Sequence, residues 1–187
     1  MKTRPSFERE VLTHRKGFRI ILVQSVSLFI LTLFDWGKML IITLLSTRDT
    51  NIRFNVYQLL GKLNDIVRAL RLFSIETQTL PLIRALIIIG LVVLAGSFLA
   101  LLASLAVRQQ KARAQWACLG FFLHALACAA CMVGAPIADS EVEIASMGIV
   151  QSIIHLTAFP YISFGVAFLS LLNACWLGRN NKKAHTL

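Results

Sequence analysis

Residues 82–107 read LIRALIIIGLVVLAGSFLALLASLAV, and Arg84 is the only charged residue in this run of 26. A helix needs about 20 consecutive apolar residues to cross the hydrocarbon core of a bilayer, which is roughly 30 Å thick. At about 1.5 Å per residue the run would be about 39 Å long as a helix, enough to cross with some tilt. The run therefore predicts a transmembrane helix.

Three further apolar runs accompany it, so that we expect spans at about residues 20–41, 82–107, 116–136 and 148–177. The composition agrees, because 57% of the 187 residues are apolar and only 15% are charged. Soluble domains carry about 25% charged residues. We predict an all-α fold, a polytopic membrane protein with four transmembrane helices in a bundle.

The positive charges predict the orientation of the chain. Residues 1–19, the turn at 108–115 and the tail at 178–187 carry twelve Lys and Arg residues, whereas the segments on the opposite side carry seven. Loops rich in Lys and Arg stay in the cytoplasm, so we expect both termini there and the plasma (cell inner) membrane as the location. The net charge of +10 is then explained by Lys and Arg residues that lie at the membrane boundaries and orient the helices. No basic stretch alternates with aromatic residues that could stack on bases, so we expect no nucleic-acid partner.

Residues 47–81 form the one sizeable segment outside the predicted spans. We expect Met39–Ser46 to continue the first helix beyond the membrane and a new helix to begin at Asn51. Apolar residues then recur three and four positions apart, which is typical of an amphipathic helix. This predicted interaction surface consists of Val56, Leu59, Leu63, Ile66, Leu70 and Phe73. An apolar stripe of this length needs a partner: the membrane surface, the protein's own helices or another protein.

Small residues predict where the transmembrane helices pack. Gly96, Ala100 and Ser104 are spaced four apart in the second span, and the third span also contains small residues, Gly120 among them. Small residues let two helix backbones approach closely in a membrane. We interpret these positions as the contact between the second and third spans, with an interface between copies of the chain as the alternative.

One face of the third span carries His124, Cys128 and Cys131, at i, i+4 and i+7. Imidazole and thiolate groups at this spacing are weak candidates for a transition-metal site. The residues can equally be structural, since cysteine behaves as a small buried apolar residue and histidine can bond between helices. We favour the structural interpretation and expect no cofactor. Cys128 and Cys131 also form a C-x-x-C motif, which keeps a membrane thiol oxidoreductase as a minor alternative.

Polar residues near the outer ends of the spans suggest a possible pathway. The candidate residues are Asp35, Lys38, Arg84, Gln151, His155 and Pro160. Ionisable groups near a bilayer are expected to pair, and Pro160 in the middle of the predicted fourth span would kink that helix. The fourth span also carries Ser163, Ser170 and Asn173. The alternative interpretations are interfacial anchoring for the charged groups and hydrogen bonding between helices for the polar ones.

Two classes of function follow. The chain contains no nucleotide-binding loop, no H-E-x-x-H, no G-x-S-x-G and no paired carboxylates within the predicted spans, so we expect no enzyme activity. The first class is a protein that binds another membrane protein, as an accessory subunit, scaffold or immunity-like binder. The second is a small homo-oligomeric channel or transporter that uses the polar fourth span. The expected partners are the lipid bilayer and another membrane protein or a second copy of the chain.

Overall fold

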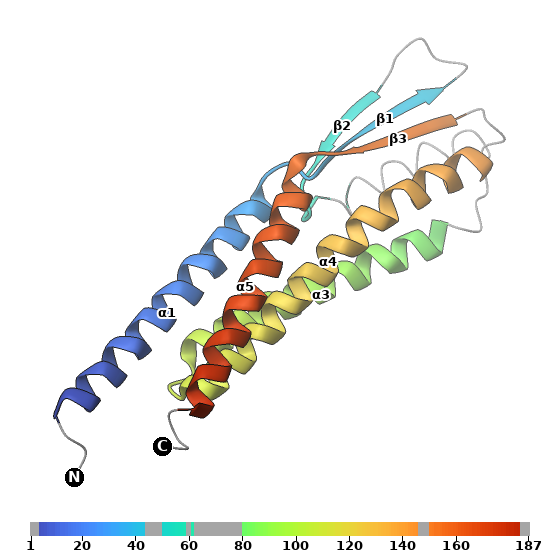
Figure 1. Ribbon diagram of the computed structural model, residues 1–187. Helices are drawn as coiled ribbons and strands as arrows, with labels where there is room; N and C mark the ends of the chain where they lie inside the picture. Colours follow the sequence, from blue (N-terminus) through green and yellow to red (C-terminus); the bar gives the residue numbers. More distant parts are fainter. Residues whose placement is uncertain (1–3, 44–49, 59–60, 62–79, 146–149, 184–187) are drawn as a thin grey trace.

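The protein is a bundle of four long helices with a small sheet at one end (Figure 1). This computed structural model describes residues 4–43, 50–58, 61, 80–145 and 150–183. The helices are α1 (Arg4–Leu33), α3 (Leu80–Ala106), α4 (Gln110–Ala145) and α5 (Ala158–Lys183). Among the described residues, four segments are long and apolar enough to cross a membrane: Lys16–Leu33, Ile87–Ala106, Gln110–Ala135 and Ala158–Arg179. The predicted four-helix membrane fold is confirmed, and the chain is a multi-pass membrane protein.

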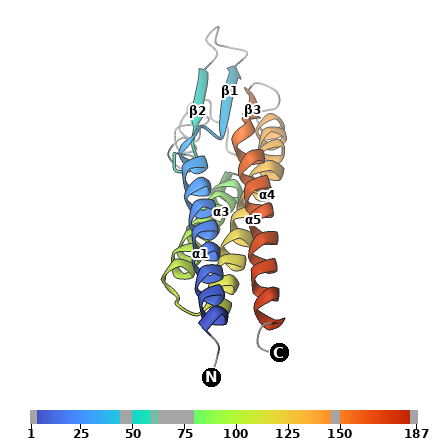
Figure 2. The ribbon, with the colours of Figure 1, turned by 60° about the vertical axis from the view of Figure 1, so that its left-hand side comes forward.

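The sheet lies at the end of the bundle where α1 ends and α5 begins (Figures 1 and 2). Its strands are β1 (Gly37–Thr43), β2 (Thr50–Phe54) and β3 (Val150–Leu156). The order is β2-β1-β3 and both pairings are antiparallel, so that β1 occupies the centre. The start of α1, the turn between α3 and α4 and the end of α5 all lie at the opposite end of the bundle.

The sheet corrects two predictions for the segment that follows the first span. The predicted continuation of the helix through Met39–Ser46 is wrong, because α1 ends at Leu33 and β1 begins at Gly37. The predicted helix start at Asn51 is also wrong, because Asn51 lies within β2. Gly37 leaves room for the ring of its partner Phe54, since a methyl group there would lie 2.5 Å from Phe54 Cζ.

Most of the predicted amphipathic helix lies outside the described residues, namely Leu59, Leu63, Ile66, Leu70 and Phe73. The one described member of that surface, Val56, lies in the turn after β2. It is buried in a cluster with Trp36, Leu94 and Cys128. Val56 therefore packs inward, against α3 and α4.

The fourth span also differs from the prediction. Residues 148–177 do not form one helix, because β3 occupies Val150–Leu156 and α5 begins at Ala158. Pro160 is the third residue of α5, where a missing N–H costs no intrahelical bond, so the predicted mid-helix kink is wrong. Thr157 precedes the helix, and its Oγ1 accepts a bond of 3.4 Å from the N–H of Phe159.

The third helix continues past its predicted end. We expected the span to end at Pro136, but α4 continues to Ala145. The apolar part of α4 does end at Ala135, so the residues beyond it extend the helix outside the membrane-spanning segment. The acidic segment after Pro136 is thus helical as far as Ala145.

The core and the surface of the bundle follow the pattern of a membrane protein. Leu28, Leu101 and Phe121 are almost completely buried and fill the interior between the helices. Large apolar side chains are instead exposed around the outside, for example Leu99 at 68% and Val92 at 66%. In a bilayer these outer side chains contact lipid, so their exposure carries no cost.

The helices α3 and α4 approach closely at the predicted small residues. A methyl group at Gly120 would lie 2.7 Å from Leu101 Cγ and 3.0 Å from the Ser97 carbonyl oxygen. On α3, Ala100 and Ser104 are buried. Gly96 is half-buried, and a methyl group there would lie 3.9 Å from Leu123 Cδ1 of α4.

Candidate functional site

Three helices meet at His124 in the interior of the bundle. Its Nε2 lies 2.9 Å from Ser163 Oγ on α5, and its Nδ1 lies 3.5 Å from Ser97 Oγ on α3. The Ser97 hydroxyl donates its own proton to the Leu94 carbonyl at 2.6 Å, so Ser97 Oγ accepts from the Nδ1–H of His124. Nε2 then accepts from the hydroxyl of Ser163. Both ring nitrogens are thus used to link α3, α4 and α5.

The two cysteines predicted to share this face lie farther along α4. Cys128 is fully buried and Cys131 is half-buried. No group of three or more His, Cys, Asp or Glu residues is arranged to hold a metal ion in the part of the chain that the structure describes. Thiol exchange requires a substrate thiol to reach the sulfur, which the burial of Cys128 prevents. The surroundings of this face favour a structural role.

The other two cysteines come together at the opposite end of the helices. Cys118 Sγ on α4 lies 3.4 Å from Cys175 Sγ on α5, and both thiols are free. Each neighbours an exposed tryptophan, since Trp116 is 43% and Trp176 is 60% exposed. Exposed Trp residues favour the membrane–water interface, which places the two thiols near that depth.

The sheet is joined to the bundle by hydrogen bonds at the junction of α1, β1 and α5. The Thr157 N–H donates to the Trp36 carbonyl at 2.9 Å, and the Thr157 hydroxyl donates to the Asp35 carbonyl at 2.6 Å. The indole Nε1 of Trp36 donates to the Leu31 carbonyl at 3.0 Å. Trp36 is only 3% exposed, so it is a buried part of the junction.

The predicted pathway residues divide into two groups. The first comprises Lys38 and His155, which are direct partners across β1 and β3, and Asp35, which precedes the sheet. The second is dispersed: Gln151 pairs with Ile42 near the far end of β3, Arg84 lies on α3, and Pro160 is buried in the first turn of α5. The structure therefore does not bring all six residues to one place.

The lipid-facing side of α5 carries one polar side chain that no prediction singled out. Asn173 is exposed beside Leu169 and Leu172, which are 65% and 53% exposed. It precedes the interfacial Trp176 by three residues, which is about 4.5 Å deeper along the helix. Its amide makes no hydrogen bond within the residues that the structure describes.

The residues that sequence reasoning missed are those whose neighbours come from distant parts of the chain. Ser163 and Asn173 appeared only as polar residues of the fourth span, yet one is fully buried and the other is exposed. Their positions on the helix differ by ten residues, so a helical wheel separates them by only about 80°. The sequence alone therefore does not show that one faces the interior and the other the outside. Arg53 was counted only as a charge, although it is the direct partner of Lys38. The strand register that reveals this pairing was not predicted.

No protein-family model matches the chain, and the search of curated proteins found no match.

Proposed function

We propose that the protein is a non-enzymatic integral membrane protein that acts by binding another membrane protein within the bilayer, as an accessory subunit, scaffold or immunity-like binder. The observation that carries this proposal is Asn173 on the lipid-facing surface of α5. An amide offers two N–H donors and a carbonyl acceptor, and the hydrocarbon region offers no water to satisfy them. A transmembrane helix of a partner can supply the missing hydrogen bonds.

The residues around Asn173 suit such a contact. Leu169 lies one turn before it and Trp176 lies one turn after it, so the three side chains lie on one stripe of α5. Both neighbours are largely exposed, which leaves the stripe available to a second helix. Dispersion contacts along the stripe and hydrogen bonds to the amide would together stabilise the complex.

The alternative function, a homo-oligomeric channel, has weaker support. Its pathway would use the polar side of α5, but Ser163 and Ser170 are fully buried inside a single copy of the bundle. The same interior is filled by Leu28, Leu101 and Phe121. A pathway lined by these serines would therefore require the helices of each copy to separate.

We also propose an orientation in which the sheet is exterior and both ends of the chain are cytoplasmic, in the plasma (cell inner) membrane. The support is the excess of Lys and Arg at the end of the bundle opposite the sheet. The exposed side chains at this end include Lys16, Arg19, Lys111 and Arg179.

The proposal can be tested by purifying the tagged protein from its native membrane in a mild detergent. We expect one foreign membrane protein at a fixed stoichiometry, lost on Asn173→Leu and retained on Leu102→Ala, which alters an exposed side chain of α3. A photo-crosslinking amino acid at position 169 should join the partner directly. A homogeneous homo-oligomer that dissociates on Asn173→Leu would instead favour the channel, and complexes indifferent to Asn173 would contradict the proposed surface.

A further inference from the structure

Three basic residues form a row across the sheet. Lys38 on the central strand β1 is the direct partner of Arg53 on β2 and of His155 on β3. Directly opposed residues of antiparallel strands point to the same face, with neighbouring strands about 4.8 Å apart. The three side chains therefore lie side by side within about 10 Å. We call Lys38, Arg53 and His155 the cationic row.

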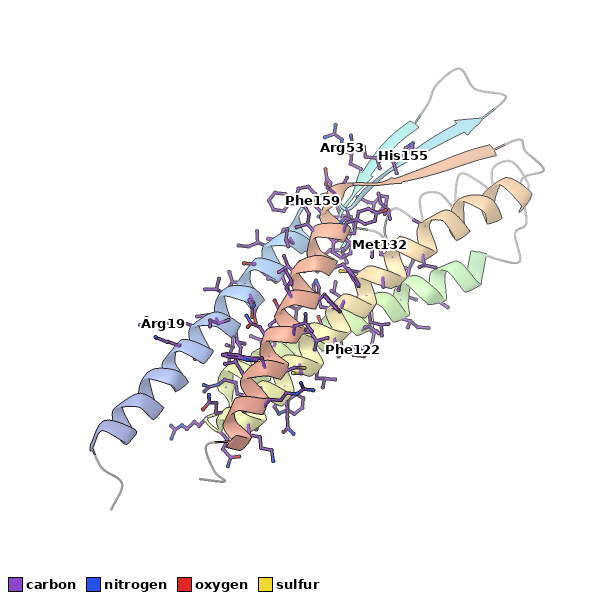
Figure 3. All side chains as sticks on the ribbon, in the orientation of Figure 1. Arg19, Arg53, Phe122, Met132, His155 and Phe159 are labelled. Carbon is purple, nitrogen blue, oxygen red and sulfur yellow. The ribbon has the colours of Figure 1, made fainter. Side chains whose placement is uncertain are left out.

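The cationic row lies on the outer face of the sheet. All three side chains are exposed, whereas the neighbouring pair Gly37 and Phe54, which faces the other way, is buried. Figure 3 shows Arg53 and His155 at the end of the sheet nearest the helices, with Phe159 at the start of α5 close by. The row is thus open to a ligand and is held by the backbone of three paired strands.

Like charges placed directly opposite each other destabilise a sheet. None of the three residues forms an ion pair within the described part of the chain, so no carboxylate of the protein offsets this repulsion there. An anion bound between these exposed side chains would offset the repulsion, which gives the arrangement a physical reason. Arg53 offers a planar pair of N–H donors, Lys38 a point charge and His155 a ring N–H, a donor set that suits a phosphate group.

The position of the row relative to the bilayer indicates where such a phosphate comes from. The rings of Phe34 and Phe159 stack with centroids 4.6 Å apart where α1 ends and α5 begins, and Phe34 is 46% exposed. Phe159 follows His155 by only four residues. The membrane-spanning segments end at Leu33 and begin again at Ala158, so the two rings lie at the apolar boundary. The headgroup layer beyond this boundary is about 5–7 Å thick. His155 lies three residues before Ala158, so the long side chains of the cationic row can reach back to this layer.

We propose that Lys38, Arg53 and His155 form a phosphate-binding site for the headgroup of an anionic phospholipid in the leaflet on the sheet side of the membrane. The site is independent of the partner surface proposed on α5, which lies near the other leaflet. It ties the sheet to the membrane surface through one lipid molecule.

The test compares thermal unfolding of the full-length protein in neutral detergent with and without added lipid. We expect phosphatidylglycerol to raise the Tm of the wild type more than phosphatidylcholine does. Arg53→Gln and Lys38→Gln should each weaken phosphatidylglycerol binding about tenfold, the effect of losing one charge-assisted hydrogen bond. Lys111→Gln removes a positive charge that is also exposed, at the other end of the bundle, and should leave the response unchanged.

The variants also distinguish a binding site from a structural one. Without lipid, Arg53→Gln should unfold at the same or a higher temperature than the wild type, because it relieves repulsion within the row. A lower Tm without lipid, or equal lipid responses of Arg53→Gln and Lys111→Gln, would overturn the proposal. Inorganic phosphate, compared with chloride of equal ionic strength, identifies the source. An Arg53-dependent shift with phosphate but none with phosphatidylglycerol would keep the phosphate site and refute the lipid.

Discussion

At the scale of single residues, the two buried serines of α5 have opposite surroundings. The Ser163 hydroxyl bonds to His124, whereas the Ser170 hydroxyl is buried and has no hydrogen-bond partner among the described residues. A buried hydroxyl without a partner loses its hydration and gains nothing in return. The two positions therefore offer a matched comparison on one helix.

We expect Ser163→Ala to destabilise the protein by about 1 kcal/mol, in the range measured for hydrogen bonds between transmembrane helices. The substitution also leaves Nε2 of His124 without its donor. Ser170→Ala should be neutral or stabilising, because it removes a polar atom that has no partner. Denaturation of both variants in detergent micelles measures the difference, and an equal cost at both positions would contradict the assigned bonding.

Gly120 permits a close approach between α3 and α4. Gly120→Ala should cost about 1–3 kcal/mol, because the added methyl group meets Leu101 and the backbone oxygen of Ser97. Gly90→Ala is the matched control, since nothing lies within 4 Å of the methyl group it would add. There the higher helix propensity of alanine should leave stability unchanged or raised by up to about 1 kcal/mol. The free energies of unfolding of both variants can be measured in detergent, and equal values would refute the close contact.

At the scale of elements, α4 and α5 can be tested through Cys118 and Cys175. Their sulfur atoms need to approach by only about 1.4 Å to reach the length of a disulfide bond. Mild oxidation of the protein in membranes should therefore link the two helices. After cleavage at a protease site inserted between α4 and β3, the fragments should stay together on a non-reducing gel.

The control moves the thiol to the neighbouring position with Cys175→Ser and Trp176→Cys. This keeps an exposed thiol at nearly the same depth but turns it by about 100° around α5, away from Cys118. The fragments of this variant should separate. Linked fragments in the control, or dimers in place of the internal bond, would show that the helices are arranged differently.

The sequence predicts the helices well and the sheet poorly, for physical reasons. The run at 82–107 has the length and composition of a membrane span, and α3 occupies Leu80–Ala106. A short apolar run such as Met39–Thr43 does not identify its own secondary structure, because its pattern fits a helix and a buried strand equally. Its partner β3 is separated from it by about 100 residues and merges with the apolar run of α5. Local periodicity contains no information on such a pairing.

The same limit applies to the candidate sites. Lys38 and His155 were predicted within one set because both lie near the outer ends of spans. Their direct pairing, and the addition of Arg53, depend on strand register. His124 was predicted to bond between helices, but identifying Ser97 and Ser163 as its partners required the packing of three helices.

At the scale of the whole molecule, the structure places the start of α1 and the end of α5 at one end of the bundle and the sheet at the other. In a cysteine-free background, Pro5→Cys and His185→Cys should resist an impermeant thiol reagent in intact cells. Gln58→Cys, an exposed position beside the sheet, should react. Permeabilised cells provide the control, since all three positions should react there. Labelling of position 5 or 185 from outside would reverse the proposed orientation.

The central position of β1 has a consequence for biosynthesis. The ribosome delivers β1 and β2 early, but β3 emerges only about 100 residues later, after α3 and α4. At roughly 5–20 residues per second, one edge of β1 waits roughly 5–20 seconds for its partner. During that interval its N–H and C=O groups can pair with any extended chain nearby. Premature termination before Val150 would leave this edge open permanently, so truncated chains should be the ones that aggregate or engage chaperones.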